Sequence, residues 1–139
     1  MNLDWDEMAA RGLRCYVRLV AEAIGVSDEA SLVQLDEPVC VYLALDRCPV
    51  CYPNSDLALV WDERHGWALA LESVGCARLG WLDAGPLPAP RTVAAYVATA
   101  CAGSGFGPAA PESGKLSRGL AARLALYAEP IPLAAVVNW

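Results

Sequence analysis

Two short apolar segments joined by a polar loop constrain the fold of this chain more than any other feature. Residues 57–61 and 67–71 each alternate large and small apolar side chains, and residues 62–66 between them are Asp-Glu-Arg-His-Gly. Because successive side chains on a strand point to opposite faces, one face of the predicted hairpin carries leucines and tryptophans. The opposite face, called the small face below, carries Ala58, Val60, Ala68 and Ala70.

The loop length and the side-chain sizes predict the same register. A five-residue loop sets Trp61 opposite Trp67 and Val60 opposite Ala68, so that large side chains meet large ones and small meet small. A shift by one residue would set large side chains against small ones. The sequence therefore predicts an antiparallel hairpin with a single register.

Helical periodicity and turn signals place the other elements around this hairpin. Helices are expected at 4–24, 91–102 and 117–128, and further strands at 39–46 and through 79–81. Ser27–Glu37 is polar and is predicted to be irregular. The expected fold is α+β, a four-stranded antiparallel meander with an N-terminal helix and C-terminal helices packed on it. Residues 1–102 are predicted to form one domain, and residues 103–139 a Gly/Pro/Ala-rich linker, a final helix and an apolar tail.

The third strand is predicted to follow a turn at Val74-Gly75-Cys76. With that turn, Leu69 meets Trp81 and Ala70 meets Gly80. Trp81 would then share the large face with the other two tryptophans of the hairpin. Gly80 would lie on the small face, where another backbone could approach closely.

The small face is the main functional clue in the pattern. The helices at 4–24 and 91–102 are expected to cover the large face, and an apolar second face needs a cover of its own. The final helix and tail, a second copy of the chain or another protein could supply it. The sequence therefore predicts a non-catalytic protein-interaction or regulatory module. Its expected interaction face comprises Ala58, Val60, Ala68, Ala70, Leu120 and Leu124.

Charge and hydropathy exclude several classes of partner. The chain has 139 residues and a net charge of −6, which argues against a nucleic-acid binder. The longest apolar runs, such as Leu133–Val137, are far shorter than the roughly 20 residues of a membrane span. Because the amino terminus is acidic where a secretory signal would be basic and then apolar, we expect a cytoplasmic protein.

Cys48-Pro-Val-Cys51 is the only segment with the spacing of a reactive or metal-binding pair. Structural zinc needs four ligands, and the chain has no second pair with this spacing. Redox chemistry of the thioredoxin kind needs a helix directly after the first cysteine, which Tyr52-Pro53 does not favour. An ordinary loop without a cofactor is the main interpretation, and zinc or thiol chemistry at Cys48 and Cys51 is the alternative.

Three further segments have both a functional and a structural interpretation. His65, the sole histidine, could act as a general base oriented by Asp62 or Glu63, although polar residues are also typical of a hairpin tip. Gly103–Gly107 resembles a phosphate loop in composition, but it follows a helix and is predicted to be a linker. The tryptophans could line a small-molecule pocket, or they could form the core.

Four segments together resemble a known family. They are Leu13–Val20, Tyr42–Asp46, Ala58–Leu69, which contains Trp-Asp-Glu-Arg-His-Gly-Trp, and Leu87–Arg91. The chain is similar over about residues 10–102 to small actinobacterial proteins catalogued only as a domain of unknown function. The resemblance implies no activity, cofactor or catalytic residue. The Cys-Pro-Val-Cys segment does not belong to the family pattern, and the residues after Gly103 fall outside it.

Overall fold

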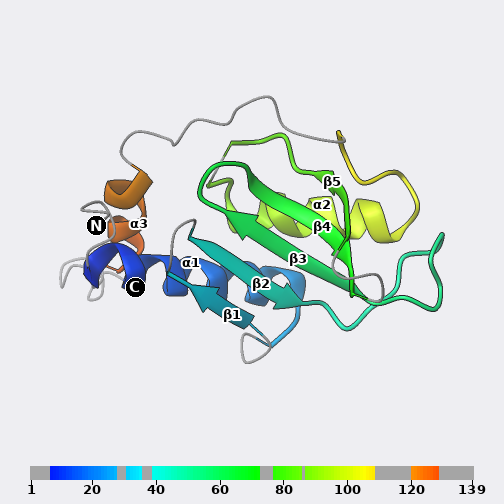
Figure 1. Ribbon diagram of the computed structural model, residues 1–139, viewed down its shortest axis with the longest axis horizontal. Coiled ribbons are helices and arrows are strands. Elements are labelled where there is room, and N and C mark those ends of the chain that lie inside the picture. Colours follow the sequence, from blue (N-terminus) through cyan, green and yellow to red (C-terminus); the bar gives the residue numbers. More distant parts are fainter. Residues whose placement is uncertain are drawn as a thin grey trace, which may run out of the picture.

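A computed structural model describes residues 7–27, 31–35, 39–72, 77–85, 87–108 and 120–128. The fold is α+β, as predicted, with an N-terminal helix, an antiparallel sheet and further helices after it (Figure 1). The elements are α1 (Glu7–Ile24), β1 (Ser31–Gln34), β2 (Cys40–Ala44), β3 (Leu57–Asp62), β4 (Gly66–Leu71), β5 (Ala77–Trp81), α2 (Pro90–Cys101) and α3 (Leu120–Ala128).

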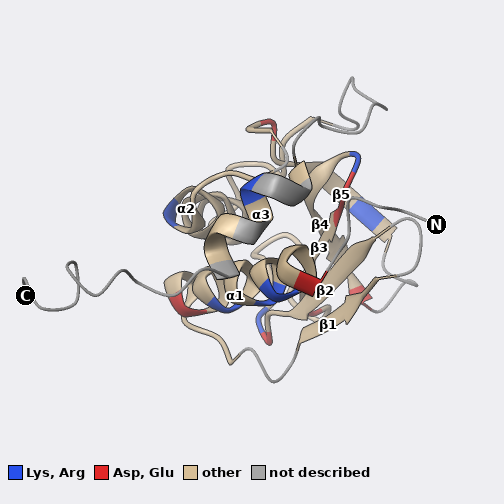
Figure 2. Ribbon diagram, turned by 90° about the vertical axis from the view of Figure 1, so that its left-hand side faces the viewer, with Lys and Arg blue, Asp and Glu red and all other residues tan. Residues whose placement is uncertain are grey.

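The sheet has five strands in the order β1-β2-β3-β4-β5, and each strand is antiparallel to its neighbours. Figure 2 shows the three helices together on one side of the sheet. Their buried side chains join one core with the large side chains of the β3–β4 hairpin. Helices α1 and α2 therefore cover the large face, as the sequence predicted.

The register of the central hairpin is confirmed. Trp61 lies opposite Trp67 and Val60 opposite Ala68, and the two tryptophan ring centroids are 6.4 Å apart. Loop length and size matching were sufficient here because both restrict the same pairing.

The prediction of four strands was wrong, because Ser31–Gln34 forms the additional strand β1. Leu32 pairs with Tyr42 and Val33 with Val41. Four residues with polar ends are too few to show a clear alternation. The strand depends instead on β2 and on the core, against which Val33 packs.

The predicted register of the third hairpin strand was also wrong. Trp81 lies opposite Ala68 and Gly80 opposite Leu69, and the register shifts between Leu69 and Ala70. Leu79 is the extra residue of this β-bulge, and it packs towards the main core. The bulge therefore moves Trp81 from the large face to the small face. Gly80 does meet another backbone as expected, but opposite Leu69.

One row of paired residues crosses the small face from edge to edge. Its members are Leu32, Tyr42, Val60, Ala68 and Trp81, each the register partner of the next. The four small residues of the hairpin are 0–8% exposed, and Tyr42 and Trp81 pack against three of them. Two aromatic side chains of the sheet itself thus provide part of the cover that the sequence analysis required.

Helix α3 packs against α1 and does not lie on the small face (Figure 2). Leu120 and Leu124 are buried in the main core, and the ring of Tyr127 lies 5.1 Å from that of Tyr16. The expectation that the two leucines belong to an accessible interaction face therefore needs correction. The two leucines reach the core because they lie on the apolar side of α3, which faces α1.

Tyr16 is the polar centre of this core. Its hydroxyl accepts a hydrogen bond from Trp67 Nε1 at 3.0 Å and donates one to the Pro88 carbonyl oxygen. Burial is the main cause that raises the pKa of the Tyr16 hydroxyl. The hydroxyl therefore stays protonated and joins α1, β4 and the segment before α2.

Several expectations lie outside the described residues. They are the start of the first helix at Asp4, the turn at 74–76, the linker beyond Pro108, the start of the last helix at Ser117 and the apolar tail at 133–139.

Candidate functional site

The glycine-rich segment after α2 packs against β5. Trp81 N–H donates to the Pro108 carbonyl oxygen at 3.0 Å, and the Tyr96 hydroxyl lies 2.6 Å from Phe106 O and 3.0 Å from Gly80 O. A Cβ on Gly80 would collide with the Phe106 carbonyl. In the segment that resembles a phosphate loop, a Cβ on Gly107 would collide with the Trp81 carbonyl, and Gly103, Gly105 and Gly107 all have a positive φ. Backbone conformation, together with close packing at Gly107, accounts for these glycines.

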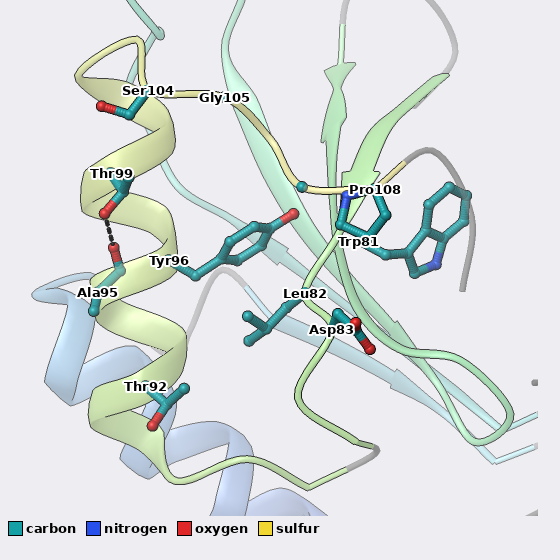
Figure 3. Close-up of a pocket in the computed structure, with 11 residues that line it drawn as sticks. Trp81, Leu82, Asp83, Thr92, Ala95, Tyr96, Thr99, Ser104, Gly105 and Pro108 are labelled. Carbon is teal, nitrogen blue, oxygen red and sulfur yellow. Dashed lines mark hydrogen bonds between the residues drawn. The ribbon is translucent and has the colours of Figure 1, made fainter. Parts of the chain in front are cut away.

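A groove of about 330 Å³ lies between this segment, α2 and the end of β5 (Figure 3). Thr92, Thr99, Ser104 and Asp83 contribute its polar groups, and all four are exposed, so the groove is open. In Figure 3 the indole of Trp81 lies on the far side of β5 from Tyr96. The other two hairpin tryptophans are buried in the core. Trp81 is thus the one tryptophan among the described residues that line this groove, which is open to solvent and not enclosed.

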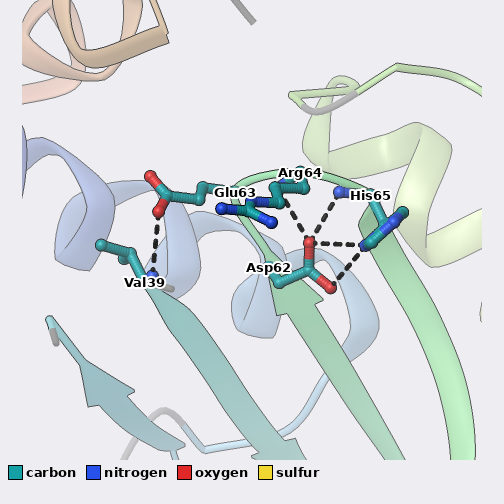
Figure 4. Close-up of polar contacts among 5 residues, drawn as sticks. All are labelled: Val39, Asp62, Glu63, Arg64 and His65. Atoms are coloured by element: carbon teal, nitrogen blue, oxygen red, sulfur yellow. Dashed lines mark hydrogen bonds and ion pairs between the residues drawn. The ribbon is translucent and has the colours of Figure 1, made fainter. Parts of the chain in front are cut away.

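The hairpin tip is organised by one carboxylate. Asp62 Oδ1 accepts the main-chain N–H of Arg64 at 2.8 Å and that of His65 at 2.6 Å, and it lies 3.1 Å from His65 Nδ1 (Figure 4). Gly66 closes the turn with a φ of 79°. Asp62 thus orients His65 as a general base would require, but the same oxygen also fixes the turn.

Glu63 points away from His65 (Figure 4) and is only 2% exposed. Its Oε1 accepts the N–H of Val39 at 3.2 Å, and its own N–H donates to the Val39 carbonyl at 3.1 Å. Glu63 therefore fixes the end of β3 to the start of β2. Of the two carboxylates considered for orienting His65, only Asp62 contacts it.

Cys48 and Cys51 both lie exposed in the loop between β2 and β3. The Cys48 thiol donates to Asp56 Oδ1 at 3.3 Å, and this hydrogen bond is the main cause that raises its pKa. A raised pKa disfavours the thiolate that metal binding and redox chemistry need. Within the ranges that the structure describes, no three His, Cys, Asp or Glu side chains lie close enough to share a metal ion.

The outer side of β1 presents the most exposed apolar surface on the sheet. Leu32 is 64% exposed, although its cross-strand partner Tyr42 is half-buried. A groove of about 240 Å³ lies beside the strand, between β1 and α1. We call Leu32, Val33 and the α1 residues Arg14 and Val17, which line this groove, the β1 margin.

Main-chain groups of β1 also face outward, away from the sheet. Val39 and Leu45 flank β2, and their main chains form hydrogen bonds with Glu63 and Leu57 on the β3 side. Because alternate residues of a strand bond to opposite neighbours, Tyr42 bonds to its partner Leu32 in β1. By the same alternation, the N–H and C=O of Val33 point away from the sheet. This site could not be predicted from the sequence pattern, because β1 itself was not predicted.

The sequence matches one known protein family. Residues 16–99 match the model of DUF6292, a family of unknown function. The chain belongs to this family. No curated protein and no solved structure matches it.

The match to DUF6292 confirms the resemblance to a family of unknown function. It begins within α1, contains all five strands and ends within α2. The hairpin tip and the β1 strand therefore belong to the family region, whereas α3 follows it. Among the helices of the described ranges, none is long and apolar enough to cross a membrane.

Proposed function

We propose that this DUF6292 protein is a non-catalytic interaction module that binds a partner protein along the β1 margin. The observation that carries the proposal is the exposure of Leu32 on β1, which pairs with β2 and with no second strand among the described residues. A half-exposed apolar strand at a sheet edge is a template for a strand of another chain. We also propose that the protein acts in the cytoplasm.

The two edges of the sheet differ. On the β5 side, the Pro108 carbonyl oxygen accepts the N–H of Trp81. On the β1 side, the N–H and C=O of Val33 face outward, and no strand among the described residues pairs with that side. The asymmetry supports β1 as the edge that a partner would extend.

The rest of the small face supports this choice of surface. Ala58, Ala68 and Ala70 are at most 1% exposed, so a partner cannot make much contact with them directly. Leu32 lies on the same face of the sheet as these alanines, at its β1 edge, and is connected to them by the cross-strand pairs Leu32–Tyr42 and Tyr42–Val60. The six residues of the interaction face expected from the sequence are all buried, so the proposed surface is instead the neighbouring edge residue Leu32.

Site-specific photocrosslinking tests the proposal. A benzoylphenylalanine is placed at position 32 of the full chain, and a matched control carries it at position 126 of α3, where Leu126 is 65% exposed. In cells that express the chain natively, we expect a discrete adduct from position 32 that position 126 does not give.

Val33→Pro supplies the decisive comparison. It removes an outward N–H without removing a bond to β2, and proline is tolerated at such edge positions. The adduct from position 32 should disappear when Val33→Pro is added to the same chain, while thermal melting verifies that the variant is folded. Identical adducts from positions 32 and 126, or an adduct that survives Val33→Pro, would refute the proposal.

A further inference from the structure

The charge of the groove beside β1 indicates what kind of segment the margin accepts. Of the described residues that line it, only Arg14 is charged, and it is exposed at the rim above the buried side chain of Val17. Arg11 and Arg18 are also exposed on α1, three residues before and four after Arg14, so the three lie along one side of the helix. The described part of the groove therefore has apolar lining side chains and one positive charge, that of Arg14.

The side chains of an added strand would alternate between the two sides of the sheet. A residue opposite Val33 would point, like Val33 itself, to the side of the helices and the groove. The residues before and after it would point to the side of Leu32 and Tyr42. One position of the partner thus meets Arg14, and its two neighbours meet apolar side chains.

We propose that the β1 margin binds an extended segment of another protein with the pattern apolar–acidic–apolar, whose carboxylate pairs with Arg14 while its apolar neighbours pack on Leu32. This inference rests on the proposed function and specifies its partner. Charge complementarity carries it, because an acidic side chain is the complement of the single described charge in the groove. A second copy of this chain, with a net charge of −6, is the alternative occupant that the experiment must separate.

Peptide display tests the pattern directly. Random nonapeptides are selected on the immobilised full chain and counter-selected on Val33→Pro, so that only edge-dependent binders remain. The best selected peptide is then synthesised and titrated in solution. We expect the selected peptides to share one Asp or Glu between two apolar residues.

Variants of Arg14 separate charge from folding. Arg14→Glu should weaken binding of the synthetic peptide by about tenfold, whereas Arg14→Lys should retain most of it. Arg91→Glu, at an exposed arginine of α2, is the matched control and should leave the affinity within about twofold. A Lys or Arg in the central position of the selected peptides, or an equal loss in both charge reversals, would overturn the inference.

The possible failures are distinguishable. Edge-dependent peptides without an acidic preference overturn the Arg14 pairing but support strand addition. If no peptide depends on Val33, both the inference and the proposed function lose their basis. If sedimentation instead shows a dimer that Leu32→Asp dissociates, the occupant is a second copy and the inference is overturned.

Discussion

Trp81 lies directly opposite Ala68, and this pairing places its indole on the small face. Its Nε1 is buried and has no hydrogen-bond partner among the described residues. Trp67 differs, since its Nε1 donates to the Tyr16 hydroxyl at 3.0 Å. The indole N–H of one tryptophan in this sheet is thus hydrogen-bonded, and that of the other is buried without a partner among the described residues.

This difference predicts different costs for the same substitution. Trp67→Phe loses a buried hydrogen bond and part of the ring, so its free energy of unfolding should fall by about 2–3 kcal/mol. Trp81→Phe also removes an unsatisfied N–H, so its loss should be below about 1 kcal/mol. Urea unfolding of both variants measures the contrast, and equal losses would contradict it.

The approach of the Phe106 carbonyl to Gly80 predicts a local effect of an added methyl group. Gly80→Ala should displace the segment 106–108 and expose the Trp81 amide, whose acceptor is the Pro108 oxygen. Exchange of that amide should accelerate by about tenfold or more. Gly85→Ala is the control. A Cβ there contacts nothing within 4 Å, so this substitution adds only the strain of an alanine at a φ of 81°.

The three contacts of Asp62 Oδ1 predict that the acceptor matters more than the charge. Asp62→Ala removes the acceptor for two main-chain N–H groups and should lower the free energy of unfolding by about 1–3 kcal/mol. Asp62→Asn keeps an oxygen in place and should lose less than half as much. Thermal or urea unfolding checks the order, and a larger loss in Asn than in Ala would disprove it.

The hydrogen bond between Cys48 and Asp56 predicts a pH dependence of thiol reactivity. The carboxylate stabilises the protonated thiol and repels the thiolate, so it raises the pKa of Cys48. Asp56→Asn removes the negative charge, so the pKa should fall and more thiolate should be present at a given pH. Alkylation at pH 8, followed by mass spectrometry of the Cys48 peptide, should therefore be faster in Asp56→Asn. Asp83→Asn should leave the rate unchanged, and no change in Asp56→Asn would count against the contact.

The central hairpin was predictable because its determinants are local. The five-residue loop and the matched sizes of Trp61 with Trp67 and Val60 with Ala68 allow one register. The helical stripes were also local, and α1 and α2 cover the large face as expected.

The remaining features depend on contacts that no local pattern contains. The bulge at Leu79 follows from how the chain fits both the main core and the small face, so the alternation alone misplaced Trp81. β1 forms because β2 is beside it. The groove next to Arg14 then needs both α1 and β1, which are distant in sequence, so the candidate site could not be assembled before the fold was known.

The hydrogen bond from the Trp81 N–H to the Pro108 carbonyl oxygen bears on how strands of other chains could add to this sheet. A sheet with two bare margins can recruit chains at both ends and grow into a fibre. Here the Trp81 N–H on the β5 side is already bonded, whereas the N–H and C=O of Val33 on the β1 side face outward. Strand addition at β1 would therefore extend the sheet in one direction and not at both ends.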